Sequence, residues 1–228
     1  MNAAENKNDA PTSSSLPPML RVHGLKLGYA VGPELVCPEN EWFAGLNLVQ
    51  GDEGVGKTAL LCTLAGALKP RGGTLDYLWR SNTKPQASDV FWQHPRTELS
   101  ETERNASCRD WIAQRARAYP QWSAAEFDRH IAGFGMEEHM HKPLLALSTG
   151  SLRKLWMAAA WASGAALTLI DEPLAALDRP SERYVQLALN EFTESAQLER
   201  VGQATRCLIV THWDAMDSVD WDDVLTLT

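Results

Sequence analysis

The most informative segment of this sequence is Gly51-Asp52-Glu53-Gly54-Val55-Gly56-Lys57-Thr58. It fits the pattern G-x-x-x-x-G-K-[ST], in which the backbone N–H groups of a glycine-rich loop surround a polyphosphate. Glycines allow the sharp turns and the close approach of backbone to ligand that such a loop needs. The lysine of the pattern reaches the β- and γ-phosphates, and the final hydroxyl binds Mg²⁺. We therefore expect this segment to bind a nucleotide, with Lys57 at the phosphates and Thr58 at the metal.

The residues on either side have the order that this loop requires. Residues 42–50 are predicted to form a buried strand before it, and residues 58–68 a helix after it, whose N-terminus favours phosphate. Asp52 and Glu53 place two carboxylates in the loop, so we expect their side chains to point away while their backbone binds. The helix carries apolar residues on one face: Leu60, Leu61, Leu64 and Leu68.

Composition limits the class of protein. A chain of 228 residues with 44% apolar residues is long enough for one large domain with a sizeable core. The net charge of −8 disfavours non-specific nucleic-acid binding. Cys37, Cys62, Cys108 and Cys207 lack metal-ligand spacing, and we interpret them as reduced thiols. We find no signal peptide and no apolar run of roughly 18 residues that could span a membrane.

The rest of the chain alternates between strand and helix patterns. Residues 1–18 lack periodicity and are predicted to be a disordered tail, which leaves residues 19–228 as the folded domain. Residues 94–150 are helical in character and are predicted to be an insertion between strands. The polar residues 194–205 are expected to be a long connection. Strands are predicted at 19–27, 74–79, 89–92, 167–170, 206–210 and 224–227, and helices at 108–117, 123–133, 151–163 and 180–193.

Alternating strands and helices predict an α/β fold, with a mainly parallel sheet covered on both faces. Residues 167–170 form a mostly apolar run that ends at Asp171 and Glu172. In open sheets of this kind, ligands bind at the carboxyl ends of the strands. Asp171 can therefore hold Mg²⁺ beside the nucleotide, and Glu172 can accept a proton from an attacking water. Thr168 interrupts the run, a change that a strand tolerates if the hydroxyl bonds to backbone.

From residue 20 to residue 212 the chain resembles the ATP-binding cassette (ABC) ATPases, specifically the nucleotide-binding subunit of an ABC transporter. The resemblance rests on Asp171-Glu172-Pro173, followed by Ala176-Leu177-Asp178 and preceded by Leu147-Ser148-Thr149-Gly150-Ser151. It implies a P-loop core with N-terminal antiparallel strands and a helical subdomain. The short length and the run from Leu167 to Asp178 resemble the haem-exporter type of subunit.

The resemblance also implies roles for single residues. Tyr29 matches the aromatic residue that stacks on adenine, and Gln93 the glutamine that contacts Mg²⁺ and the attacking water. Glu172 matches the catalytic glutamate, and His212 the histidine that contacts the γ-phosphate. Ser148 and Gly150 match the signature loop that completes the site of a second subunit.

Two residues depart from the usual signature LSGGQ: Thr149 replaces its first glycine and Ser151 its glutamine. The Thr149 side chain would crowd the approach to the γ-phosphate. Because of this departure, a second alternative remains: an ABC-like module that closes on ATP but hydrolyses it weakly.

The family implies ATP and Mg²⁺ as ligands, and two cassettes paired head to tail, from one chain or from two different ones. It also implies separate membrane permease subunits and a cytoplasmic location at the inner face of the membrane. The chain ends soon after His212, so we expect no added regulatory domain. A soluble, non-transport ABC switch in translation or DNA repair is the alternative. Such proteins usually carry two cassettes or a long coiled-coil insertion. A P-loop kinase or GTPase does not explain the Leu-Ser-x-Gly segment.

Overall fold

The structure, a computed structural model, describes residues 17–29, 34–80, 84–94, 97–199 and 206–228. Nearly all of the predicted tail, and residues 200–205 of the predicted polar connection, lie outside these ranges. Within them, no helix combines the length and the apolar character that a membrane crossing requires.

A five-stranded sheet runs through the centre of the molecule in the order β6-β7-β8-β4-β9, and all of its neighbouring strands are parallel. Every residue of β7 and β8 is buried, which is why their sequences read as apolar runs. The mainly parallel sheet was predicted correctly. Its strands are β4 (Gly45–Gln50), β6 (Val90–Trp92), β7 (Leu167–Asp171), β8 (Cys207–His212) and β9 (Asp223–Thr226).

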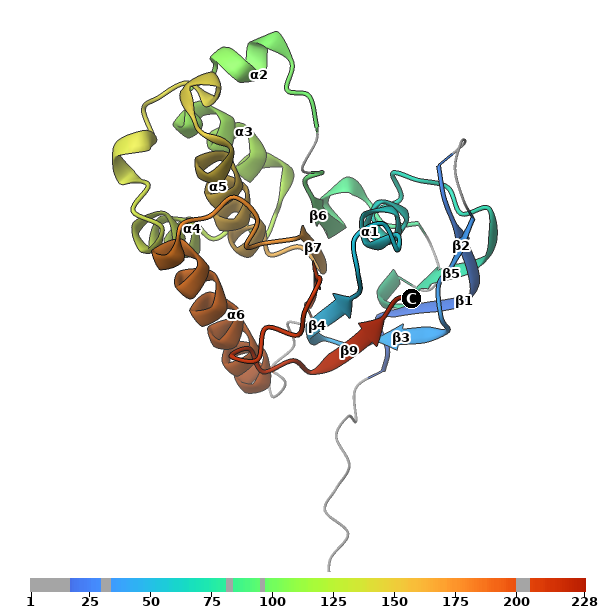
Figure 1. Cartoon of the computed structure of the whole chain (residues 1–228). Coiled ribbons are helices and arrows are strands. Elements are labelled where there is room, and N and C mark those ends of the chain that lie inside the picture. The colour runs from blue at the N-terminus through green and yellow to red at the C-terminus, as the bar shows by residue number, and fades with distance from the viewer. Residues whose placement is uncertain (1–16, 30–33, 81–83, 95–96, 200–205) are drawn as a thin grey trace, which may run out of the picture.

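A second, antiparallel sheet is built around β1 (Figure 1). The prediction of one strand over residues 42–50 was wrong, because the chain changes sheets within it. β3 ends at Trp42, and Gly45 opens β4 with a φ of 130°, a left-handed conformation that favours glycine. The strands of this sheet are β1 (Leu20–Leu27), β2 (Leu35–Val36), β3 (Asn40–Trp42) and β5 (Gly72–Tyr77).

Helix α1 (Lys57–Leu64) packs in the core between the two sheets. Leu60, Leu61 and Leu64 are fully buried there with Trp42. The helix is shorter than predicted, because the chain turns at Gly66, whose φ is 74°.

Of the other helices, those over Thr149–Ala162 and Arg179–Glu199 pack against the opposite face of the parallel sheet, and the remaining ones lie farther from it (Figure 1). Their apolar side chains, Trp111 and Leu155 among them, form one cluster with Ile170 and Val210 of the sheet. These helices are α2 (Glu101–Asn105), α3 (Cys108–Ala118), α4 (Ala124–Gly133), α5 (Thr149–Ala162) and α6 (Arg179–Glu199). Short 3₁₀ turns lie at Leu78–Arg80, Ala87–Asp89, Glu137–His139 and Leu144–Ala146.

The predicted end of the last helix needs correction. Helix α6 continues to Glu199, although a polar connection was expected from residue 194. Glu, Ala, Gln and Leu in this stretch are good helix formers, and helix propensity outweighs the lack of an apolar pattern. The Thr168 hydroxyl accepts a hydrogen bond from the Arg206 side chain at 3.3 Å. All four cysteines are free and buried, as expected for thiols.

Candidate nucleotide-binding site

The glycine-rich loop joins β4 to α1, and its backbone explains its glycines. Gly54 and Gly56 have φ angles of 85° and 100°. A Cβ at Gly56 would lie 2.2 Å from the side chain of Leu35, and one at Gly51 would lie 2.7 Å from the carbonyl oxygen of Leu227. Larger residues would therefore deform the loop. The side chains of Asp52 and Glu53 are exposed.

Lys57 begins α1 and is 7% exposed. Its Nζ donates hydrogen bonds to the carbonyl oxygens of Gly51 at 2.6 Å and Asp52 at 3.0 Å. The same Nζ lies 3.1 Å from Oε1 of Glu172. The lysine thus folds back over its own loop and pairs with the carboxylate that follows β7.

Asp171 ends β7 and lies beside Thr58. The Thr58 hydroxyl donates to Asp171 Oδ2 at 2.8 Å, and the Thr211 hydroxyl donates to Oδ1 at 2.6 Å. Hydroxyl and carboxylate oxygens are the ligands that Mg²⁺ prefers. Thr58 and Asp171 therefore form a donor set that fits this ion.

Glu172 and His212 lie at the ends of neighbouring strands. Glu172 adopts a φ of 46°, and its N–H donates to the carbonyl oxygen of Thr211 at 3.0 Å. Its Oε2 lies 4.0 Å from Nε2 of His212. On its other side, the imidazole of His212 has Nδ1 at 2.9 Å from Oδ1 of Asp214. The Glu172 carboxylate is thus flanked by Lys57 and His212.

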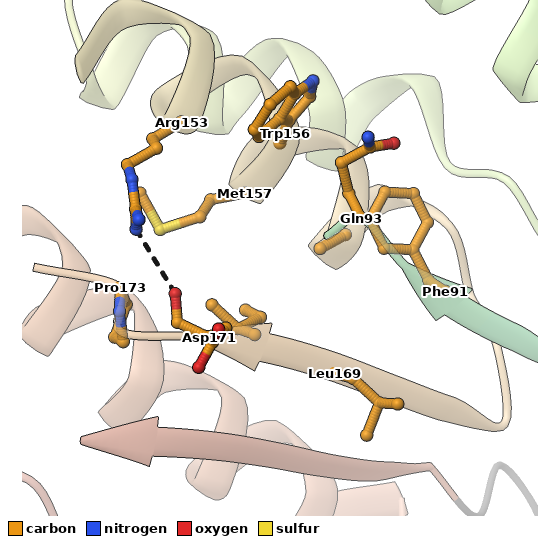
Figure 2. A pocket seen from close by; sticks show the side chains of 10 residues that line it. Phe91, Gln93, Arg153, Trp156, Met157, Leu169, Asp171 and Pro173 are labelled. Carbon is orange, nitrogen blue, oxygen red and sulfur yellow. Dashed lines mark hydrogen bonds between the residues drawn. The ribbon is translucent and has the colours of Figure 1, made fainter. Parts of the chain in front are cut away.

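Gln93 follows β6, next to β7 in the sheet. Its Oε1 accepts a hydrogen bond from Nη2 of Arg115 at 3.0 Å. It lines a cleft together with Asp171, Arg153 and Trp156 (Figure 2). Gln93 therefore lies at the same edge of the sheet as Asp171, although its side chain is hydrogen-bonded to Arg115 of α3.

The signature segment lies at the start of α5. The Ser148 hydroxyl caps the helix by accepting from the N–H of Ser151 at 3.0 Å. A Cβ at Gly150 would lie 2.5 Å from the carbonyl oxygen of Ala176, so glycine is needed here by a contact within the chain. Among the contacts of the described residues, none joins Ser148 or Gly150 to the phosphate loop of the same chain.

Tyr29 lies just after β1 and is 50% exposed. Burial raises the pKa of the Cys62 thiol in α1, and hydrogen bonds from the side chains of Tyr29 and Trp92 oppose that rise. The tyrosine therefore lies against the helix that follows the phosphate loop.

A family model described as ABC transporter matches residues 45–175. This chain belongs to the ABC transporter family. The match covers more than half of the chain and includes the phosphate loop, the signature segment and Asp171-Glu172. The predicted family is therefore confirmed.

Curated ABC relatives are named as ATP-binding proteins of transport systems. The chain is 26% identical over 172 residues to the cytochrome c biogenesis ATP-binding export protein CcmA of Tatumella citrea, covering 75% of this chain and 77% of that one. It is 26% identical over 190 residues to the molybdenum import ATP-binding protein ModC of Shewanella oneidensis, covering 74% of this chain and 49% of that one.

The fold has ABC counterparts among solved structures. An ABC transporter ATP-binding protein from Pyrococcus furiosus superimposes with a TM-score of 0.70 at 20% identity, over 91% of this chain and 96% of that one. This likeness confirms the predicted fold class.

Three site residues of this ABC chain were missed by sequence reasoning. Thr211 contacts both Asp171 and Glu172, Asp214 contacts His212, and Arg153 bonds to the backbone after β7. A signal existed for Thr211, which is a hydroxyl at the carboxyl end of a buried strand. Arg153 gave none, because an arginine on a helix usually faces solvent.

Proposed function

We propose that this chain is the ATP-binding and ATP-hydrolysing subunit of an ABC transporter and drives transport through separate membrane permease subunits. One observation carries the proposal. The phosphate loop and the end of β7 meet through two contacts, Lys57 Nζ to Glu172 Oε1 at 3.1 Å and Thr58 Oγ1 to Asp171 Oδ2 at 2.8 Å. These are the groups that the hydrolysis of a nucleotide needs in one place.

The proposed binding step exchanges partners at Lys57. Its ammonium group leaves the carboxylate of Glu172 for the β- and γ-phosphates of ATP, while the loop N–H groups bind the remaining phosphate oxygens. Thr58 and Asp171 hold Mg²⁺, and Gln93 is proposed to reach it from β6. The ion supplies charge neutralisation on the phosphates when it is bound. Tyr29 is proposed to stack on the base.

The proposed chemical step uses the carboxylate that Lys57 releases. Glu172 orients a water and accepts its proton as the water attacks the γ-phosphorus. His212, whose Nε2 lies 4.0 Å from this carboxylate, contacts the γ-phosphate. Its neighbour Asp214, 2.9 Å from Nδ1, favours the imidazole orientation that points Nε2 at the site.

The proposed site is completed by a second cassette, an identical chain or a paired one. Ser148 and Gly150 lie apart from their own phosphate loop, which supports a role toward the nucleotide of a partner. Head-to-tail pairing about a two-fold axis gives each ATP one phosphate loop and one signature segment. Hydrolysis removes the γ-phosphate contacts and lets the pair reopen.

The location proposed for the subunit is the inner face of the membrane, held there by a permease. The relatives named above serve export in one case and import in the other. The proposal therefore concerns ATP hydrolysis alone. The direction of transport and the transported substrate depend on the permease, and the resemblance to a haem exporter stays a prediction.

The test compares two lysine variants in MgATP binding and steady-state hydrolysis. Lys57→Met removes the ammonium group at the phosphates, and we expect turnover to fall at least ~100-fold because transition-state charge loses its counter-charge. Lys69→Met removes an exposed lysine beyond α1 and serves as the matched control. Wild-type protein that binds MgATP without hydrolysing it would support the weakly hydrolysing alternative. Equal turnover in both variants would contradict the proposed site.

A further inference from the structure

Arg153 lies on α5 and reaches the backbone at the end of β7. Its Nη1 donates to the carbonyl oxygen of Glu172 at 2.7 Å and to that of Asp171 at 3.3 Å. Figure 2 shows the side chain descending from the helix to the end of the strand beside Pro173. The guanidinium group is therefore hydrogen-bonded to the main chain of Asp171 and Glu172, the two residues whose carboxylates belong to the site.

This contact matters because of the backbone at Glu172. A φ of 46° is uncommon for a residue other than glycine, and this strained conformation persists only where the surrounding structure holds it. Thr211 holds the N–H of Glu172, through its carbonyl oxygen at 3.0 Å and its hydroxyl at 3.2 Å. Arg153 holds the carbonyl oxygen of the same residue. The two contacts fix both peptide groups of Glu172 and thereby the direction of its side chain.

The electrostatics at Arg153 favour a persistent contact. Partial burial lowers the pKa of the guanidinium, and the charges of Asp171 and Glu172 raise it. An arginine remains ionised through such opposing shifts, and its bonds to the two carbonyls are charge-assisted.

The same turn of α5 is attached to the segment after β7 at two further points. Gly150 packs against the carbonyl oxygen of Ala176, and Lys154 Nζ lies 3.0 Å from Oδ2 of Asp178. This turn begins at Ser148, which caps the helix. A displacement of Ser148 would therefore be carried to Glu172 through Arg153.

We propose that Arg153 is a positioning residue for Glu172. Its guanidinium group fixes the main chain that aims the carboxylate at the attacking water, and it links that carboxylate to the helix that starts at Ser148. The proposal rests on the function proposed above, in which Glu172 accepts the proton.

Three variants test this role, and MgATP affinity and thermal unfolding are measured for each. Arg153→Met keeps the apolar stem and removes the donors, and we expect kcat to fall about 10- to 100-fold, as displaced catalytic groups do. We expect KM and MgATP affinity to stay within about 2-fold, because no contact to the nucleotide is lost. Arg153→Lys keeps a donor and should recover part of kcat. Arg183→Met removes an exposed arginine on α6 and should leave kcat unchanged.

A second comparison separates positioning from a general structural role. In single-turnover measurements, Arg153→Met should slow the wild-type protein but not the Glu172→Gln protein, because residues that act through one group are non-additive. Equal slowing in both backgrounds would overturn the proposal, as would a kcat for Arg153→Met equal to that of Arg183→Met. Wild-type protein without turnover would instead overturn the proposed function, and the positioning role with it.

Discussion

Lys57 Nζ and Glu172 Oε1 lie 3.1 Å apart, so the cation of the phosphate loop is paired with the carboxylate that follows β7. The lysine is 7% exposed and the glutamate 29% exposed, and such partly buried pairs are costly to break on one side. In the proposed mechanism, ATP replaces the carboxylate at Lys57 before Glu172 acts on water. The Lys57–Glu172 pair is then proposed to keep Glu172 from acting until a nucleotide binds.

Removing the negative charge of Glu172 should tighten nucleotide binding, because ATP then has no competitor at Lys57. We expect Glu172→Gln to bind MgATP about 5-fold more tightly, which corresponds to ~1 kcal/mol. Glu53→Gln removes a carboxylate from an exposed position in the same loop and is the control. Titration with a fluorescent ATP analogue measures both. Equal affinity in the two variants would show that the pair does not compete with the nucleotide.

The Thr211 hydroxyl should matter for stability and turnover together, since it donates to Asp171 at 2.6 Å and accepts from the N–H of Glu172 at 3.2 Å. Thr211→Val keeps the shape and removes both bonds. We expect a loss of about 1–2 kcal/mol in the free energy of unfolding and about 10-fold slower hydrolysis. Thr211→Ser keeps the hydroxyl and should stay near wild type. Chemical denaturation and ATPase assays check this, and a valine variant as active as the serine variant would contradict it.

Asp178 should stabilise α6 as its N-cap. Its Oδ1 accepts from the N–H of Ser181 at 2.9 Å, and its Oδ2 lies 3.0 Å from Lys154 Nζ. These contacts hold the pKa of this carboxyl well below its usual range. We expect Asp178→Ala to cost about 1 kcal/mol in unfolding free energy, while Asp178→Asn, which can still cap, costs less. The stabilisation should be fully present above the ordinary carboxyl pKa and be lost as the pH falls from that value to the lowered pKa of the folded protein. Denaturation curves at neutral pH for both variants, and at a series of acidic pH values for the wild type, measure the two effects.

His130 should make the fold less stable in mild acid. It is fully buried, stacked on Trp161 with ring centroids 4.5 Å apart, and its Nδ1 lies 3.0 Å from the hydroxyl of Tyr184. Burial, and then the charge of Arg129, lower its pKa to about 4, while the charge of Glu126 opposes them.

Below the ordinary pKa of histidine, His130 binds a proton in the unfolded chain but stays neutral in the folded chain. Stability should therefore fall by about 2 kcal/mol as the pH drops from 7 to 5. His130→Gln should flatten this pH dependence, and His141→Gln, at an exposed position, should not. Melting temperatures from pH 5 to 8 decide between them, and a slope equal in all three proteins would contradict the assignment.

Much of the fold could be predicted from local sequence, because a strand of the parallel sheet that is buried on both faces appears as an apolar run. Residues 167–170 and 206–210 were read correctly as buried strands for this reason. The same signal failed at residues 42–50, where apolar residues continue across a change of sheet. The glycine at position 45, where φ is 130° in the structure, was the local sequence signal of that change of sheet.

The candidate site divides in a similar way. The sequence pattern alone identified four candidate residues, because each has a fixed place relative to a glycine loop or a strand end. They are Lys57, Thr58, Asp171 and Glu172. Arg153 reaches the site through a contact between α5 and the end of β7, which are distant in sequence. Asp214 contacts His212 through the geometry of a loop. No pattern in one sequence encodes either contact. Ser148 and Gly150 were found by resemblance, and their place at the start of α5 gives Gly150 a second, internal reason to be glycine.

The central claim is an ATP-driven pairing of cassettes, and its most direct test is the size of Glu172→Gln protein in solution. We expect a monomer without nucleotide and a dimer with MgATP in sizing chromatography, because the variant binds ATP and cannot remove its γ-phosphate. Wild-type protein should hydrolyse MgATP at least ~100-fold faster than the variant. A variant that stays monomeric in saturating MgATP, beside a wild type without turnover, would contradict an identical-chain motor.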